Sequence, residues 1–473
     1  MGRIVFQLSN ARGSDGSPTV SIALVPKDLD SEEVLFSCNA AENVFKETAK
    51  QEIGADAIKL AGARLFSAVT EHPAIGDQLK AALLNQVESP VYIWFATKDG
   101  VELLPWEAMC SPEGEFLGLD ERWALGRMAT AKAGSGMFHT LEPPVRIAAV
   151  LSCLGITAAG ELAALRESLA VMAPGQVELL VVASEEEVVT ALQGEIAAGT
   201  APGVRVEVIP SDLGELQTMV REFRPHILHF FCHGSVAGGP HLQLAVKSDW
   251  ETANPTGGLT AEAGQFKAFK RDGDELWLIV LNCCEGAAPS PTADAQSLAL
   301  GLIREGHAPV VVAMREPVVN QVAESLTLGL YGKLLTEIGE RLKTPGSPPA
   351  PLDWARMMVA ARDKLARNHK GMLLSQAAAS TKEWTLPVVY VRPDEFHLQV
   401  ATPPAGQFAV AGGAADDHNR EARLEIEALQ SLLRSLPPGQ ALELRADAVA
   451  RMNELASQLG IELPPDALDH TGN

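Results

Sequence analysis

Short apolar runs alternate with helix-like segments from residue 145 to about residue 340. Each apolar run is five to seven residues long, and the segments between them repeat apolar residues at helical spacing. This alternation is typical of a parallel sheet buried under helices on both faces. We therefore predict an α/β fold with a parallel-rich sheet. Strands are expected at 145–151, 177–182, 204–209, 227–231, 276–281 and 309–314, and helices near 158–171, 184–196, 212–223, 295–305 and 318–338.

The sequence on either side of this region is less regular. Residues 1–140 are predicted to form an α/β amino-terminal part, with strands at 4–8, 20–25 and 91–95 and an amphipathic helix at 75–85. A stretch around Gly134-Ser135-Gly136 reads as a linker to a second domain at 145–395, which a helix at 353–369 and a strand at 384–391 complete.

A Pro-, Gly- and Ala-rich linker at 400–418 precedes a tail at 419–473 with two predicted helices, 420–436 and 441–459. Two helices alone bury too little surface to be stable. We therefore expect the tail to dock on the body, to dimerise or to bind a partner.

Composition excludes several classes of function. A net charge of −22 argues against a nucleic-acid-binding surface, and we attribute it mainly to solubility, with basic partners as the alternative. No apolar run is long enough to cross a bilayer, and the amino terminus lacks a signal-peptide pattern, so a cytoplasmic protein without membrane contact is expected. The six cysteines show no zinc-type spacing and are expected to be reduced. No cofactor or metal is expected.

Two of the predicted strands end in reactive side chains. The run at 227–231 is followed by Cys232-His233-Gly234, and the run at 276–281 by Asn282-Cys283-Cys284-Glu285-Gly286. Carboxyl ends of parallel strands share one edge of the sheet, so the histidine and the cysteines are expected to meet there. A histidine about fifty residues before a cysteine is the spacing of caspases. An imidazole that takes the thiol proton makes the sulfur a nucleophile, and the sequence therefore predicts a cysteine–histidine hydrolase.

The adjacent cysteines leave two candidates for the nucleophile. Strand alternation sends one side chain into the core and the other toward the rim, and it does not by itself say which. The caspase signature has a small residue just before its cysteine, which favours Cys284, with Cys283 as the core residue. Backbone N–H groups of Gly234 and Cys284 are the expected oxyanion donors. The isolated Cys38, Cys110, Cys153 and Cys232 are interpreted as inert packing.

Other polar residues near the two strand ends have weaker assignments. His229 has even spacing to His233 on the same strand and is interpreted as a core or supporting residue rather than a metal ligand. Glu285, Asp294 and Asp249 lie on predicted active-site loops and are candidates for an acidic pocket that accepts Arg or Lys. Glu285 has two further interpretations, orienting the histidine or facing solvent.

Several ordered motifs resemble the CHAT peptidases, bacterial relatives of caspases and separase. Leu104-Pro105-Trp106-Glu107 resembles the family's LPWE element, and an arginine follows at Arg127. The segment 229–234 resembles its HFACHG motif, and 281–286 resembles its LSACET motif. The resemblance covers about 75–391 and implies a caspase-like catalytic domain with a pseudo-caspase-like amino-terminal part. It also implies His233 as general base and Cys284 as nucleophile.

The chain departs from the family pattern near the nucleophile. Asn282-Cys283 stands where the family usually has Ser-Ala, Gly286 replaces a Thr, and 315–320 lacks the usual Trp and Asp. These differences put the substrate preference in question.

The resemblance implies an endopeptidase that cuts specific protein substrates in a bacterial defence or cell-death pathway. The substrate is expected to be a protein, with one encoded by a neighbouring gene as a candidate, and a sensor or partner protein is expected to activate the enzyme. The alternative is a catalytically silent adaptor that acts by binding proteins. The tail and the segment 235–275 are candidate switching elements.

Overall fold

The computed structural model describes most of the chain up to residue 401. The described residues are 2–12, 18–25, 34–36, 43–95, 102, 104–131, 138–252, 258–283, 286, 288, 297–368 and 373–401. They belong to one unit, Met1–Pro403. The predicted Gly-Ser-Gly linker, the linker after residue 401 and the helical tail lie outside them, so these interpretations stay predictions.

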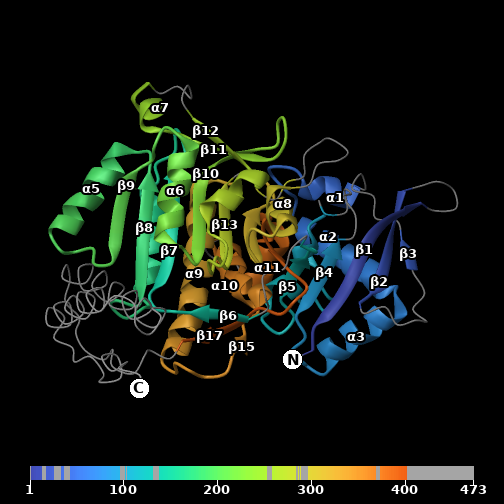
Figure 1. The fold of residues 1–473 in the computed structure, drawn as a ribbon. Helices are drawn as coiled ribbons and strands as arrows, with labels where there is room; N and C mark the ends of the chain where they lie inside the picture. The colour runs from blue at the N-terminus through green and yellow to red at the C-terminus, as the bar shows by residue number, and fades with distance from the viewer. Residues whose placement is uncertain are drawn as a thin grey trace, which may run out of the picture. The chain divides into compact units, whose positions relative to one another are not determined.

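A single large sheet runs through the described residues (Figure 1). In spatial order its main strands are β3 (Val34–Phe36), β2 (Pro18–Leu24), β1 (Ile4–Arg12), β4 (Val91–Phe95), β5 (Leu125–Met128), β16 (Pro387–Val391), β14 (Val310–Met314), β13 (Leu278–Cys283), β10 (Ile227–Ser235), β7 (Val145–Ser152), β8 (Val177–Ala183) and β9 (Val204–Val208). The six strands from β14 to β9 in this order are parallel to one another, as the apolar runs predict. The predicted α/β fold with a parallel-rich sheet is confirmed.

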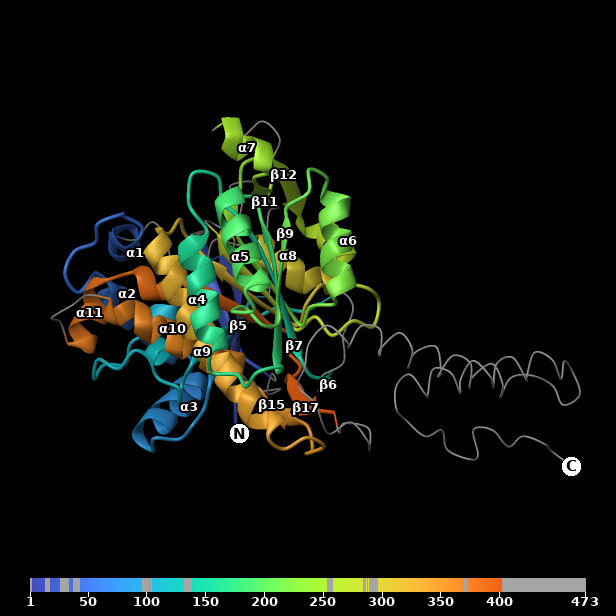
Figure 2. The same cartoon turned by 90° about the vertical axis from the view of Figure 1, so that its left-hand side faces the viewer.

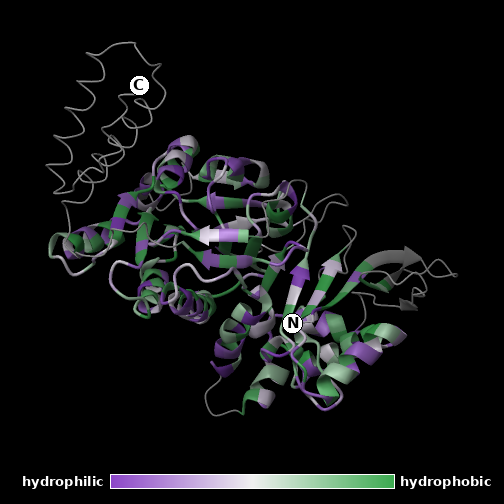
Figure 3. Ribbon diagram, turned by 60° about the horizontal axis from the view of Figure 1, so that its bottom comes forward, coloured by the Kyte–Doolittle hydropathy of each residue, from purple (hydrophilic) through white to green (hydrophobic). Residues whose placement is uncertain are grey.

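Helices cover both faces of the parallel strands (Figure 2). One face packs against α4 (Ala159–Leu169), α5 (Glu186–Ala197), α9 (Asn320–Leu342) and α10 (Trp354–Arg367), and the other against α6 (Leu213–Phe223) and α8 (Leu298–Glu305). Side chains alternate between the two cores, because successive residues of a strand point to opposite faces. In β10, Ile227 and Phe231 belong to the first core, and Leu228, Phe230 and Cys232 belong to the second. Figure 3 shows hydrophobic residues along the strands of the sheet.

The amino-terminal part shares this sheet with the rest of the chain. Strand β5 pairs with β16, which runs antiparallel to β14, so β16 joins the two halves. A third core lies beneath α1 (Asn43–Thr48), α2 (Ala57–Thr70) and α3 (Pro73–Leu84). The boundary predicted between residues 140 and 145 therefore does not interrupt the sheet, and separate domains on its two sides stay a prediction.

A buried ion pair stabilises this junction and gives the LPWE-like segment a structural role. Glu107, in the short 3₁₀ helix Trp106–Ala108, accepts two hydrogen bonds of 2.8 Å from the guanidinium of Arg127 in β5. Arg127 also donates to the carbonyl oxygen of Glu102 at 2.8 Å. Both side chains of the ion pair are fully buried. Burial alone would raise the pKa of Glu107, but the adjacent Arg127 holds it below its ordinary value.

Strand β10 is longer than the apolar pattern predicts, which corrects the expected end at residue 231. Its last three residues pair antiparallel with β11 (His241–Leu244), which pairs in turn with β12 (Leu259–Glu262). A short helix α7 (Lys247–Thr252) and a 3₁₀ helix, Ala263–Phe269, complete this extension. His233 and Gly234 therefore lie within a strand and not after it. The candidate switching segment 235–275 is folded over its described residues.

The remaining described elements are a small second sheet and short helical segments that pack against α10. They are the small sheet of β15 (Ala350–Pro351), β17 (His397–Val400) and β6 (Phe138–Leu141), the helix α11 (Leu374–Ser380) and the 3₁₀ turns Leu117–Leu119 and Glu383–Thr385. None of the helices in the described ranges is both long enough and apolar enough to cross a bilayer.

The buried histidine His226 lies just before β10. We predict that its environment makes the fold less stable in acid. Its ring is buried, stacks on Trp277 at 4.5 Å and accepts a hydrogen bond from the Arg146 N–H at 2.9 Å. Burial, together with the nearby Arg146 and Arg224, lowers the pKa of His226 from 6.5 to about 3. Between these values the unfolded chain binds a proton that the folded chain does not, so stability falls as pH falls through this window.

From pH 7 to 4, His226 should therefore destabilise the fold by about 3 kcal/mol. The measurement is the free energy of unfolding in guanidinium at both pH values. The control is His226→Asn, whose side-chain oxygen still accepts from Arg146 but does not titrate. An equal decline in wild type and variant would contradict the assignment.

Candidate active site

The imidazole of His233 is held at the rim by a backbone carbonyl. His233 lies near the end of β10 and is half-buried. Its Nε2 is 2.8 Å from the carbonyl oxygen of Leu154, in the segment that connects β7 to α4. A carbonyl oxygen only accepts hydrogen bonds, so this contact places the ring proton on Nε2. In the neutral ring, Nδ1 then carries the lone pair and is the basic atom.

Cys153 also contacts this imidazole. Its Sγ lies 3.6 Å from His233 Nε2, and the residue is buried. The interpretation of Cys153 from the sequence as an inert core residue does not include this contact with His233. The available signal was position: Cys153 directly follows β7, which is the neighbour of β10 in the parallel sheet, so it lies at the same rim.

Cys283 is the residue of the cysteine pair that the structure describes, and its side chain faces away from His233. Cys283 ends β13 and lies in register with Cys232, the residue before His233. Both thiols belong to the core on the α6 and α8 face. Phe231 and Cys153 belong to the opposite core, so His233, two residues after Phe231 in the same strand, faces that side. Cys283 therefore occupies the core position predicted for it. Cys284 and Glu285 lie outside the described residues, as does Asp294.

The residues flanking the pair explain one departure from the family pattern. A Cβ built on Gly286 would lie 3.2 Å from both Cys283 Sγ and Leu281 Cβ, which is tighter than normal packing. Cys283 is larger than the alanine usual at its position, and Gly286 is smaller than the usual threonine. The two changes therefore compensate each other in volume.

Gly234 and Asp249 are the other two candidate site residues that the structure describes. Gly234 lies in β10 in register with Leu242 of β11. Asp249, in the first turn of α7, is fully buried, and its carboxylate accepts the Val246 N–H at 2.9 Å. This contact gives Asp249 a role in forming the turn before α7. Its place in a specificity pocket stays a prediction, as do the oxyanion role of Gly234 and the pocket roles of Glu285 and Asp294.

His229 lies beneath His233 as a buried residue on the same strand face, in line with its sequence interpretation. Its Nδ1 is 3.1 Å from the hydroxyl of Tyr331 in α9. Its Nε2 is 3.0 Å from a carboxylate oxygen of Glu161 in α4. Over the described ranges, no three His, Cys, Asp or Glu side chains gather as a set of metal ligands.

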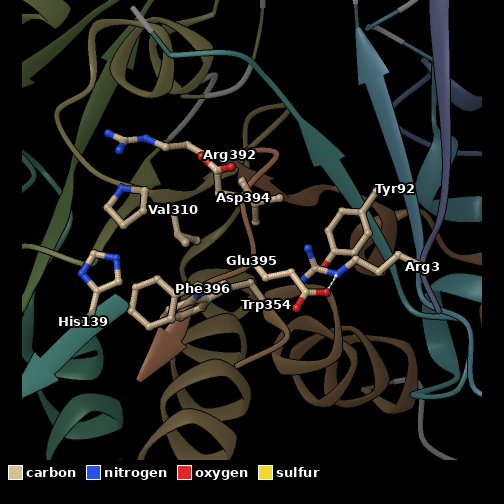
Figure 4. A pocket seen from close by; sticks show the side chains of 11 residues that line it. Arg3, Tyr92, His139, Val310, Trp354, Arg392, Asp394, Glu395 and Phe396 are labelled. Atoms are coloured by element: carbon tan, nitrogen blue, oxygen red, sulfur yellow. Dashed lines mark ion pairs between the residues drawn. The ribbon is translucent and has the colours of Figure 1, made fainter. Parts of the chain in front are cut away.

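A small cavity lies at the opposite end of the strands, where β14 begins and β16 ends (Figure 4). Its lining includes Arg3, His139, Trp354, Arg392 and Glu395, and Arg3 forms an ion pair of 3.4 Å with Glu395. The cavity volume of ≈ 20 Å³ suffices for about one water molecule. It is too small for a peptide side chain and lies away from His233, so it is not part of the candidate active site.

Comparisons with known proteins identify the family of the chain. The model of the CHAT domain family matches residues 59–345, which is more than half of the chain and includes both strand ends. A search of curated proteins gives no match. Among solved structures, a chain in the crystal structure of the Saccharomyces cerevisiae separase–securin complex aligns with a TM-score of 0.34 and 13% identity. The alignment covers 66% of this chain and 16% of that chain.

Proposed function

Because the chain belongs to the CHAT domain family, we propose that it is a cysteine endopeptidase with His233 as general base and Cys284 as nucleophile. The observation that carries the proposal is the His233 imidazole at the sheet rim, oriented by the Leu154 carbonyl. The adjacent strand β13, in register with β10, ends at the same rim with Cys283, the residue before Cys284. These are the base, its orienting group and the site of a nucleophile.

Chain connectivity supports Cys284 as the partner of His233. Cys232 and Cys283 pair in register, so the residues that follow them, His233 and Cys284, start from neighbouring positions. Consecutive Cα atoms are about 3.8 Å apart, and neighbouring strands about 4.8 Å apart. Asn282 and Cys283 face opposite sides of β13. An extended backbone at the next residue would put the Cys284 side chain on the face of Asn282, which is also the face of His233.

The proposed reaction is amide hydrolysis through a thioester. Nδ1 of His233 takes the thiol proton, and the Cys284 sulfur attacks the scissile carbonyl carbon. Backbone N–H groups of Gly234 and Cys284 stabilise the oxyanion. The C–N bond then breaks, and the imidazolium gives its proton to the leaving amine. Water hydrolyses the thioester with the same imidazole as base, which restores the thiol and releases the carboxylate.

Cys153 and Cys283 are alternative candidates for the nucleophile. Their contacts predict that substituting either one slows cleavage much less than substituting Cys284. Cys153→Ala removes a contact to the Nε2 side of His233 but keeps the Leu154 hydrogen bond, so cleavage should fall less than about tenfold. Cys283→Ser should keep the reaction, because its side chain faces the other core. The measurement is the initial rate of cleavage of a fluorogenic peptide library. Complete loss in either variant, with Cys284→Ala active, would reassign the nucleophile.

The finer proposal concerns substrate and context. We propose a regulated protease of a bacterial defence or cell-death pathway, with a protein substrate and an activating protein partner. An acidic pocket of Glu285, Asp294 and Asp249 would favour Arg or Lys before the cut bond.

The test is co-expression of wild type and Cys284→Ala with each protein encoded beside the gene, followed by fragment mapping by mass spectrometry. Fragments that require Cys284 and end in Arg or Lys would support the proposal. An effect on cells that Cys284→Ala keeps in full would instead favour the adaptor.

A further inference from the structure

Five polar side chains meet in the apolar core directly beneath His233. They come from four different elements, and each is at most 1% exposed. They are Glu161 of α4, His229 of β10, Asn282 of β13, and Thr327 and Tyr331 of α9. Polar groups in such a core are costly unless they are hydrogen-bonded, so the contacts among them need an explanation.

One carboxylate oxygen is at the centre of the cluster. Glu161 Oε1 accepts a hydrogen bond from Asn282 Nδ2 at 3.0 Å and another from the hydroxyl of Thr327. The same oxygen lies 3.0 Å from His229 Nε2, an ion-pair distance, although the ring N–H points obliquely to it. Asn282 Nδ2 also donates to the Ala323 carbonyl of α9 at 3.0 Å. A single atom therefore links α4, α9 and both strands that end at the active site.

Tyr331 fixes the orientation of the His229 ring. Burial, together with the nearby Glu161 carboxylate, raises the pKa of Tyr331 well above its ordinary value, so the side chain remains a hydroxyl. This hydroxyl lies 3.1 Å from His229 Nδ1. A hydroxyl that donates to Nδ1 leaves the ring proton on Nε2, on the side of Glu161.

Burying this polar cluster costs more free energy than apolar packing at the same positions would. Glu161 Oε2 and Asn282 Oδ1 are buried and have no hydrogen-bond partner within the described part of the chain. Replacing a buried charged cluster by apolar residues of similar volume is often neutral or stabilising. A partly satisfied polar cluster of this kind therefore indicates a purpose other than stability.

The cluster lies where it fixes the geometry of the active site. His229 is four residues before His233 on the same strand face, and Asn282 is two residues before Cys284. Glu161 lies in the first turn of α4, and the segment before this helix carries Leu154, whose carbonyl oxygen orients His233. The strand of the base and the strand that leads to the nucleophile thus both contact the Glu161 carboxylate.

We propose that Glu161 and Asn282 are positioning residues that hold the ends of β10 and β13 at the separation that the His233–Cys284 pair needs. This inference rests on the proposed function. Asn282 stands where the family usually has serine, whose shorter side chain reaches less far, so the link from β13 to Glu161 is a feature of this chain.

The test measures alkylation of Cys284 in the full-length protein by iodoacetamide as a function of pH, with peptide mapping by mass spectrometry. Thiolate is the reactive form, so the pH profile reports whether an imidazole assists the thiol. The variants are Glu161→Gln, which keeps the shape of the side chain, and Asn282→Ser, which shortens the link. The control is Ser168→Ala, a buried α4 residue whose hydroxyl bonds only within the helix, to Ala164, at 2.9 Å.

Both variants should alkylate Cys284 at least about tenfold more slowly at pH 7, with the midpoint of the profile moved up by about one pH unit or more. Ser168→Ala should keep the wild-type profile even if its thermal unfolding midpoint falls. If Glu161→Gln does not fold, the alkylation profile of Asn282→Ser alone tests the positioning role.

Two negative outcomes are distinguishable. Wild-type profiles in both variants, with a different profile in His233→Ala, would overturn the positioning role alone. A profile that is the same in wild type and in His233→Ala would show that no cysteine–histidine pair exists, and the proposed function would fail with it.

Discussion

Replacing Cys284 by alanine is expected to abolish peptide cleavage, with a loss on the order of 10⁶-fold in kcat. The sulfur forms the thioester, so no other group in the proposed reaction replaces it. His233→Ala should lose a similar amount, because base and nucleophile act as one unit and their losses do not add. The measurement is the cleavage rate of the mapped substrate or peptide for both single variants and the double variant.

Two controls show that the loss is chemical. The unfolding midpoint of Cys284→Ala should stay close to that of wild type, since the change removes one atom. Cys283→Ser, on the opposite face of the sheet, should stay active. Losses in the two single variants that multiply in the double variant would contradict a concerted pair, and an active Cys284→Ala would rule out the proposed nucleophile.

Breaking the Glu107–Arg127 pair is expected to destabilise the fold by about 3–5 kcal/mol. Glu107→Ala leaves the guanidinium of Arg127 buried without the carboxylate that accepts two of its hydrogen bonds. Its remaining hydrogen bonds are to the neutral carbonyl oxygens of Glu102 and Leu104 and the hydroxyl of Tyr390. A buried charge without its counter-ion is among the largest single-residue costs known. The measurement is the free energy of unfolding from guanidinium denaturation at pH 7.

The control is an exposed ion pair in which a lysine takes the place of the arginine. Glu340 and Lys343 lie 2.6 Å apart on the surface of α9, with side chains 62% and 66% exposed. Glu340→Ala should change stability by less than about 0.5 kcal/mol. Equal effects of the two substitutions would show that burial does not govern the cost at Glu107. The double change to Glu107→Leu and Arg127→Met should recover part of the loss, because the buried guanidinium is removed together with its main counter-ion.

The parallel half of the fold was predictable because its strands are buried on both faces. Such strands are continuous apolar runs, and all six runs from residue 145 to 314 form neighbouring strands. The end of β10 was not predictable in the same way. His233-Gly234-Ser235 is not an apolar run, and it is a strand because β11 pairs with it. Pairing with a later segment leaves no local signal in the sequence.

From the sequence, only those residues of the candidate site that follow a predicted strand could be identified. Position after a strand marked His233 and the cysteine pair, and alternation separated Cys283 from the face of His233. Position directly after β7 was an available signal for Cys153, but the contacts of Leu154 and Glu161 were beyond the sequence. They depend on how the turn after β7 and the start of α4 pack against β10, which involves residues about eighty positions apart.

The position of β16 has a consequence for the order in which the protein matures. This strand is among the last described segments of the chain, yet it lies between β5 and β14. Until it has left the ribosome, β5 and β14 are two open strand edges, and the halves they belong to are not joined. A nascent chain thus holds both His233 and Cys284 before its sheet is complete. If the proposed activity needs the complete sheet, it begins only after residue 391 has been synthesised, well after both residues of the pair.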